Sequence, residues 1–227
     1  PHFYIYIVMY FGAILYLSAS TVITAREFQN RSRLLIYPLI LFVMAETIIQ
    51  VALPELHVTW LCVTLLSVLY FIYCSEMWNQ LDALTGLLNQ NSYLKQTGGV
   101  RCKGGVLVVF DVDDFKQIND RYGHIQGDLC LAGIAECIKK SYANFGYCYR
   151  IGGDEFCVLL KNGGNEGRCK QEFLQRLQEK RGEIAFLPTV SYGSAPFSGE
   201  DIVKVKDRAD QDMYQYKKER KNRKRLS

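Results

Sequence analysis

The chain has 227 residues and is 49% apolar, with 27 basic and 23 acidic side chains and a mean hydropathy close to zero. These figures exclude an intrinsically disordered chain, a collagen-like repeat and a small disulfide scaffold. The mean conceals a division, because residues 1–78 carry only 7 charges whereas residues 79–227 carry 43. We therefore expect a membrane region followed by one soluble domain that is large enough for its own core.

Three long runs in the first region carry almost no charge. Residues 1–25 and 56–75 have none, and residues 34–54 have only Glu46. About 20 helical residues cross a hydrocarbon core, and a helix satisfies its own backbone there. We predict three transmembrane helices, with buried helices of a soluble protein as the alternative. Glu46 would either fix the packing of these helices or take part in sensing.

The orientation follows from the loops between these runs. The linker 25–33 holds three arginines, whereas the second linker, near Pro54 and Glu55, holds no basic residue. The positive-inside rule places the first linker, and everything after Glu76, in the cytoplasm. The first residue is proline and no basic segment precedes the first run, which disfavours a cleaved signal peptide. We expect a fragment whose missing N-terminus holds further spans.

The eight cysteines include no CxxC pair, which leaves a zinc ribbon or a thioredoxin-like site unsupported. In a reducing cytoplasm most of them should be small buried residues, with a redox sensor as the alternative.

The second region alternates helices and strands in the order of the ferredoxin-like, split β-α-β fold of the α+β class. A helix-like passage extends the third span into one continuous helix over about 68–84. The residues after it predict a short helix at 91–96, a sheet-centre strand at 106–112, a helix at 128–144, a hairpin of 147–151 and 155–160, a helix at 168–181, one or two strands within 183–195 and a helix at 201–218.

Two carboxylates should meet at one edge of this sheet. Asp111 lies where the central strand ends, and Asp154 lies in the hairpin turn, 43 residues later. Each alone is typical of an ordinary turn or a solvated strand end. Together they offer oxygen ligands that suit Mg²⁺, with Mn²⁺ as a second candidate, and such a cation could neutralise a triphosphate.

Four blocks of sequence carry a resemblance to a known family: DALTGLLN at 82–89, FDVDDFKQINDRYGHIQGD at 110–128, RIGGDEF at 150–156 and ADQDMYQYKK at 209–218. In this order and with these gaps they resemble the GGDEF family of diguanylate cyclases over nearly all of residues 82–226. The resemblance implies a nucleotidyl-cyclase palm. It also implies condensation of two GTP molecules into cyclic di-GMP and two pyrophosphates, by a homodimer that holds one GTP in each domain.

The resemblance also implies roles for particular residues. Asp111, Asp154 and Glu155 would be catalytic, and Asp111, Asp154 and the carbonyl of Val112 would ligate the metal. Asn119 and Asp128 match the positions that bind guanine. The remaining substrate contacts would involve phosphate and come from Asp114, Phe115, Lys116, Lys217 and Lys221.

Several positions depart from the family pattern. The family's Asn-Arg pair is Asn89-Gln90 here, and its Gly-Arg-Asn is Arg220-Lys221-Asn222. A lysine lacks the bidentate fork of arginine, so phosphate affinity should be reduced. The Arg-x-x-Asp site for product inhibition is replaced by Ala143 and Gly146, so we predict no inhibition through that site.

The basic tail 217–225 should contact substrate phosphate and, beyond it, anionic membrane lipid, with a solvated end as the alternative. Nucleic acid is not needed to explain it, and no P-loop motif occurs. The sequence thus predicts a multi-pass protein of the bacterial inner membrane with a regulated cytoplasmic diguanylate cyclase. The alternatives are a catalytically weak GGDEF domain that binds GTP or signals by contact, and a membrane scaffold.

Overall fold

The computed structural model describes residues 59–98, 104–161 and 163–226, together with seven isolated helical positions between residues 12 and 52. The chain divides into two compact units, Pro1–Asn79 and Gln80–Ser227. Apart from the isolated positions, the predicted spans 1–25 and 34–54 lie outside the described residues.

In the first unit, helix α3 covers Thr59–Trp78 and overlaps the third predicted span, 56–75. Within the described ranges, no helix combines the length and the apolar character that crossing a membrane requires. The structure therefore does not support that span.

The predicted continuous helix over 68–84 is wrong beyond Trp78. The chain turns after this residue, and Leu81 enters an isolated β-bridge. The side chain of Asp82 then accepts hydrogen bonds from the backbone N–H and the hydroxyl of Thr85, at 2.9 and 2.6 Å. These side-chain hydrogen bonds compete with helix formation and close a turn instead.

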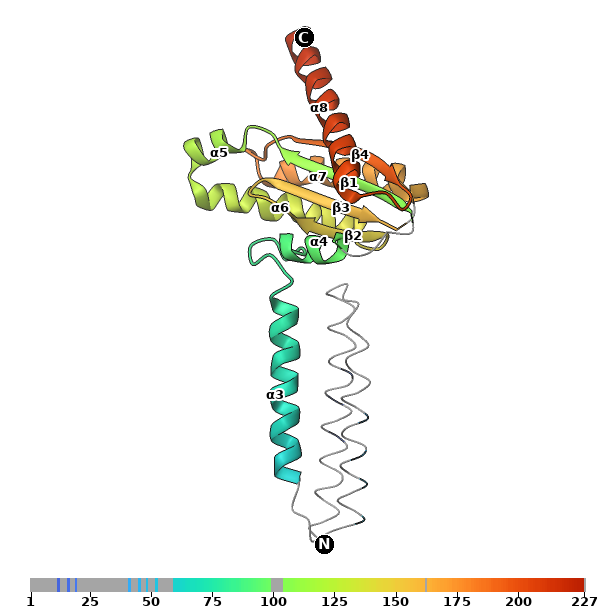
Figure 1. The fold of residues 1–227 in the computed structure, drawn as a ribbon. Helices are drawn as coiled ribbons and strands as arrows, with labels where there is room; N and C mark the ends of the chain where they lie inside the picture. Colours follow the sequence, from blue (N-terminus) through green and yellow to red (C-terminus); the bar gives the residue numbers. More distant parts are fainter. Residues whose placement is uncertain are drawn as a thin grey trace. The chain divides into compact units, whose positions relative to one another are not determined.

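The second unit contains a four-stranded antiparallel sheet in the order β2-β3-β1-β4 (Figure 1). This is the split β-α-β plan of the ferredoxin-like fold, so the predicted α+β class is confirmed. The strands are β1 (Gly105–Val112), β2 (Gly146–Arg150), β3 (Glu155–Leu160) and β4 (Val190–Phe197).

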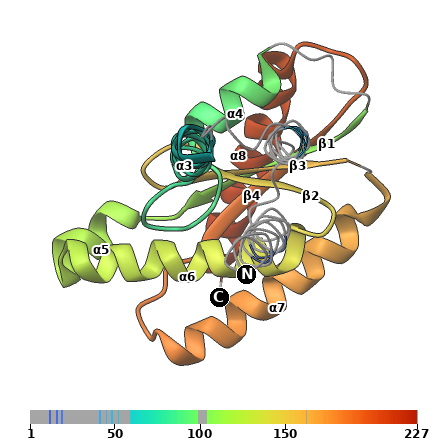
Figure 2. The ribbon, with the colours of Figure 1, turned by 90° about the horizontal axis from the view of Figure 1, so that it is seen from below.

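Helices cover both faces of this sheet (Figure 2). Side chains along β1 alternate between the two faces, since successive residues of a strand point to opposite sides. Phe110 packs on the face that α6 and α7 cover, whereas Val109 packs with residues of α4 and α8. The helices are α4 (Gln90–Thr97), α5 (Phe115–Tyr122), α6 (His124–Tyr142), α7 (Glu166–Glu183) and α8 (Ile202–Leu226).

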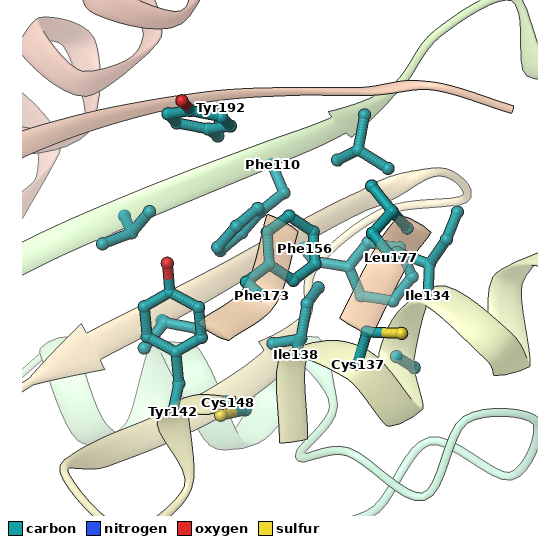
Figure 3. Close-up of a cluster of buried hydrophobic side chains, with 14 of the residues drawn as sticks. Phe110, Ile134, Cys137, Ile138, Tyr142, Cys148, Phe156, Phe173, Leu177 and Tyr192 are labelled. Atoms are coloured by element: carbon teal, nitrogen blue, oxygen red, sulfur yellow. The ribbon is translucent and has the colours of Figure 1, made fainter. Parts of the chain in front are cut away.

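Aromatic rings fill the core on the side of α6 and α7 (Figure 3). The ring of Phe110 meets those of Tyr142 and Phe173 edge on, at centroid distances of 5.6 and 5.1 Å. Five cysteines are buried, and burial raises the pKa of Cys148 to about 12. Because all five are buried, the prediction of small buried residues is confirmed for them. A thiol whose pKa is raised is also a poor nucleophile.

The sequence missed helix α5 and underestimated helix α8. Helix α5 has only eight residues, and its apolar residues Phe115 and Ile118 pack against the core while only partly buried, so the pattern is too short to identify a helix. Helix α8 continues to Leu226, eight residues beyond the predicted end, and segment 183–195 contributes to one strand only.

Helix α8 packs closely on β4 at Gly193. A Cβ atom there would overlap the carbonyl oxygen of Ala209 and the backbone nitrogen of Met213. Because both obstacles are backbone atoms, they cannot move aside without shifting the helix.

We expect Gly193→Ala to lower the free energy of unfolding by about 2–3 kcal/mol, because the added methyl group overpacks this contact. Urea denaturation of the full chain, followed by circular dichroism, measures the change. Gly182→Ala in α7 is the control, since among the described residues no atom outside its own stretch of helix lies within 4 Å of the position that its Cβ would take. It should stabilise by about 0.5–1 kcal/mol. Equal stabilities of the two variants would contradict the packing argument.

Candidate active site

The acidic ends of β1 and β3 lie side by side. Asp111 is opposite Glu155 in the pairing of the two strands, and the Val112 N–H donates to the Asp154 carbonyl at 3.2 Å. The structure therefore brings these four residues to one edge of the sheet, as the sequence predicts for Asp111 and Asp154. Gly152 and Gly153, which precede Asp154 in the turn, have no side chain themselves.

Arg150, the last residue of β2, holds the acidic turn in place. Its Nη2 donates to the Gly153 carbonyl at 2.7 Å, and its Nη1 donates to Asp82 Oδ1 at 3.1 Å. Burial acts to raise the pKa of Asp82, but hydrogen bonds from Thr85 and Arg150 outweigh it and lower that pKa. One arginine thus connects the first turn of the domain to the turn that contains Asp154.

Lys217 reaches from α8 to the acidic end of β1. Its Nζ lies 2.5 Å from Asp111 Oδ2 and 3.3 Å from Asp113 Oδ1. Partial burial acts to lower the pKa of Lys217, but the bonds and charges of the two carboxylates outweigh it and raise that pKa. The lysine is therefore a stable cation beside the carboxylates. The sequence predicted it as a phosphate contact but did not foresee its contact with Asp111.

Asp113 is a site residue to which the sequence analysis gave no role. Its carboxylate is buried and accepts hydrogen bonds from Ser191 Oγ at 2.7 Å and Thr189 Oγ1 at 2.9 Å. It also pairs with Lys217 and with Arg220 Nη2, the latter at 3.1 Å. All four partners are distant in sequence, so only the fold brings them to Asp113.

The predicted phosphate-binding segment forms the start of α5. Asp114 has φ 55° and ψ 29°, a left-handed conformation that non-glycine residues rarely adopt and that is frequent at functional turns. Phe115 packs against the core, whereas Lys116 is exposed. The backbone N–H groups of a first helical turn favour anions such as phosphate.

The predicted guanine contacts lie on adjoining helices. Asn119 on α5 abuts Gly127 on α6, where a Cβ atom would overlap the Asn119 Oδ1. The Asn119 Oδ1 is buried without a hydrogen-bond partner among the described residues. Asp128, which follows Gly127 on α6, is exposed. A buried acceptor without a partner indicates a place for a ligand donor.

The oxygen donors at this edge fit a hard cation. All the candidate ligand atoms are oxygens, from the carboxylates of Asp111 and Asp154 and the carbonyl of Val112. Mg²⁺ is commonly bound by one or two protein carboxylates together with substrate phosphates. In the described part of the chain, no three His, Cys, Asp or Glu side chains are grouped so that they could hold a metal ion by themselves. Lys217 would have to release Asp111. Lys221 lies in α8, but its side chain is outside the described residues.

The two positions that replace the product-inhibition motif carry no charge. Ala143 caps α6, and Gly146 begins β2. A Cβ atom at Gly146 would overlap the carbonyl of Leu159, so this backbone position has no room for an aspartate.

Comparison with known proteins gives consistent matches for the second unit. Residues 79–223 match the family model described as "Diguanylate cyclase, GGDEF domain". Diguanylate cyclase DgcS of Shewanella oneidensis is 32% identical over 154 residues, which cover 64% of this chain and 52% of that protein. The probable diguanylate cyclase DgcJ of Escherichia coli is 30% identical over 151 residues, which cover 63% of this chain and 30% of that protein. The match thus spans about half or less of each relative.

Solved structures agree with this result. The GGDEF domain of DgcB from Caulobacter crescentus, determined in complex with c-di-GMP, is 26% identical and has a TM-score of 0.51. The match covers 61% of this chain and 90% of that one. The coiled coil and GGDEF domain of the same protein gives a TM-score of 0.56 at 24% identity, covering 70% and 93%, which supports the fold alone.

We expect Asp82→Asn to lower the free energy of unfolding at neutral pH by about 1–2 kcal/mol, because a charge-assisted hydrogen bond to Arg150 is lost. The pKa of Asp82 is lowered from 3.8 in the folded protein, so its stabilisation exists above that pH and is lost as the pH falls through the folded value. Urea titrations between pH 7 and pH 3 should therefore show the gap to the wild type closing in acid. A gap that stays constant with pH would contradict this origin. Asp207→Asn, at an exposed position of α8, is the control and should show no gap.

Proposed function

The chain belongs to the GGDEF family of diguanylate cyclases, and from this premise we propose that it condenses two GTP molecules into cyclic di-GMP and two pyrophosphates. The observation that supports this most directly is the meeting of Asp111, Asp154 and Glu155 at one sheet edge, with Lys217 beside them. Acidic oxygens and a fixed cation suit phosphoryl transfer, which depends on positioning and on electrostatic stabilisation.

Residues at the sheet edge would bind and orient the triphosphate. Asp111, Asp154 and the carbonyl of Val112 would hold Mg²⁺, or Mn²⁺ in its place, which supplies neutralisation of the phosphate charge when bound. In this structure the Nζ of Lys217 contacts Asp111 and Asp113. It would turn from Asp111 towards the phosphates when the metal binds Asp111. Lys116 and Lys221 would add positive charge. Glu155, exposed beside Asp154, is the further acidic residue that we expect turnover to require.

Guanine would be selected at the junction of α5 and α6. An acidic oxygen of Asp128 accepts from the ring N1–H and the exocyclic amine of guanine, a donor pattern that adenine lacks. Asn119 adds the buried oxygen that has no partner among the described residues. A site built to pair such donors rejects a base without them, because its polar groups are then left unsatisfied.

Two copies of the chain would be needed for each product molecule. Every domain has one set of these residues, and cyclic di-GMP contains two phosphodiester bonds. In the proposed homodimer each 3′-hydroxyl attacks the α-phosphate of the GTP on the facing domain, and pyrophosphate leaves. Regulation would then act on the fraction of domains that face each other correctly.

We also propose that residues 1–78 attach the domain to the bacterial inner membrane as several spans, with the basic tail near anionic lipid. The support is sequence alone: long runs without charge and an arginine-bearing linker. Expression of the chain followed by an alkaline wash of the membranes tests this. Recovery of the chain in the wash would contradict it.

The alternative is a GGDEF domain that binds GTP or a partner without turning it over. The full chain in detergent, given GTP and Mg²⁺, should release pyrophosphate and cyclic di-GMP in a one-to-two dinucleotide-to-pyrophosphate ratio. ATP in the same assay should give at least about a hundredfold less product, given the discrimination that unsatisfied polar groups provide. Binding of GTP without product, at high concentrations of chain, would favour the alternative. Equal rates with ATP would contradict the role of Asp128.

We expect Asp154→Ala to abolish turnover, by about a thousandfold or more, because one of the two carboxylates for the metal is lost. Asp154 makes its hydrogen bond to Val112 through the backbone carbonyl, which the substitution keeps. The thermal unfolding midpoint should therefore stay within about 2 °C of the wild type. Retained turnover with an intact fold would contradict the assignment, and Asp207→Asn serves again as the control.

A further inference from the structure

Asp113 combines deep burial with an unusual number of partners. Only 6% of the residue is exposed, yet its carboxylate contacts two hydroxyl groups and two cationic side chains. Its own backbone N–H donates to the Thr189 carbonyl at 2.8 Å. A buried charge is tolerated only when it is paired and hydrogen-bonded, and these contacts satisfy that condition.

The two hydroxyl groups fix the direction of this carboxylate. Ser191 donates to Oδ1 and Thr189 donates to Oδ2, so each oxygen has one neutral donor from the β4 side of the sheet. Each oxygen also faces one cation, Lys217 at Oδ1 and Arg220 at Oδ2. The carboxylate is therefore held between β4 and α8 and cannot follow a cation that moves away.

Lys217 lies closer to one of its two carboxylates than to the other. Its Nζ is 2.5 Å from Asp111, which the proposed reaction assigns to the metal, and 3.3 Å from Asp113, which is not a proposed metal ligand. If Asp111 released the lysine to a metal, Asp113 would remain as its counter-ion. The lysine would then keep one negative neighbour and could bind phosphate on its other side.

Arg220 strengthens the arrangement from the same helix. It lies three residues after Lys217, and its Nη1 donates to the Val190 carbonyl at 3.4 Å while its Nη2 pairs with Asp113. Residues three apart lie on one face of a helix, so both cations approach Asp113 from the same side. This arginine connects the helical turn that carries Lys217 to the first residue of β4.

We propose that Asp113 is a positioning residue that acts through Lys217 to bind the terminal phosphates of GTP. The proposal rests on the proposed function, since it deepens the same nucleotide site. Asp113 touches no phosphate. It sets where the Lys217 ammonium stands once the metal occupies Asp111, and Arg220 keeps α8 at the distance that this requires.

The test compares two ligands that differ in the terminal phosphates. Binding to the full chain with Mg²⁺ is measured by calorimetry for GMP and for a GTP analogue with a methylene bridge between the α- and β-phosphates. Asp113→Asn should weaken binding of the analogue about tenfold, the usual effect of losing one charge-assisted contact. It should change GMP binding by less than about twofold, since GMP does not reach Lys217. A purely structural role would weaken both ligands alike, and that result would overturn the proposal.

A double-mutant cycle separates action through Lys217 from a direct effect. Asp113→Asn combined with Lys217→Ala should bind the analogue no more weakly than Lys217→Ala alone. Additive losses would overturn the proposal. Asp207→Asn, which removes an exposed carboxylate from α8, should leave both affinities unchanged.

A second variant covers the case in which Asp113→Asn does not fold. Thr189→Val removes one hydroxyl from the carboxylate and keeps the side-chain shape, so it should give a smaller, about threefold, loss that is again confined to the analogue. Loss of GMP binding to the same extent would overturn the proposal. A wild-type chain that binds the analogue selectively but makes no cyclic di-GMP would refute the proposed function alone. A wild-type chain that does not bind the analogue would refute both.

Discussion

The pairing of β1 with β3 on one side and β4 on the other is the constraint on which the candidate site depends. It places an almost uncharged strand in the centre of the sheet, where its backbone groups are satisfied by two ladders and both faces are covered by helices. The register sets Asp111 opposite Glu155 and Ser191. A shift by one residue would turn Asp111 to the face of α6 and α7, where an unpaired charge would be buried.

Helix α8 gives this acidic edge its positive charge. Its position along the sheet is set by close packing at Gly193, where the helix backbone leaves no room for a side chain. Lys217 lies two turns beyond Ala209 on the same helix and reaches Asp111 and Asp113 from there. Packing in the core and electrostatics at the site are therefore coupled, because displacement of the helix would separate the lysine from its carboxylates.

Arg150 provides a comparable connection at the other end of the site. Its guanidinium contacts the Asp82 turn, which follows α3 in sequence, and the carbonyl of Gly153 beside Asp154. The two ends of the arrangement are held by different cations, one on a strand and one on a helix. Arg150 joins the Asp82 turn to the backbone next to Asp154, whereas Lys217 contacts the carboxylate of Asp111 directly.

The sequence by itself determined the elements with a clear apolar pattern and the chemical kind of the site. The buried run of β1, the Gly-Asp turn and the order of strands and helices identified the sheet and placed Asp111 and Asp154 at its edge, because strand ends and tight turns are local features. Helix α5 was not predicted because it is only eight residues long and mostly polar. The helix expected through residue 84 is replaced by the local turn around Asp82. Only the tertiary structure decided that Lys217 and Arg220 share Asp113 and that Arg150 joins Asp82 to Gly153. These contacts join residues separated by up to 107 positions in the chain, and no periodicity or spacing encodes which of many charged side chains the fold will bring together.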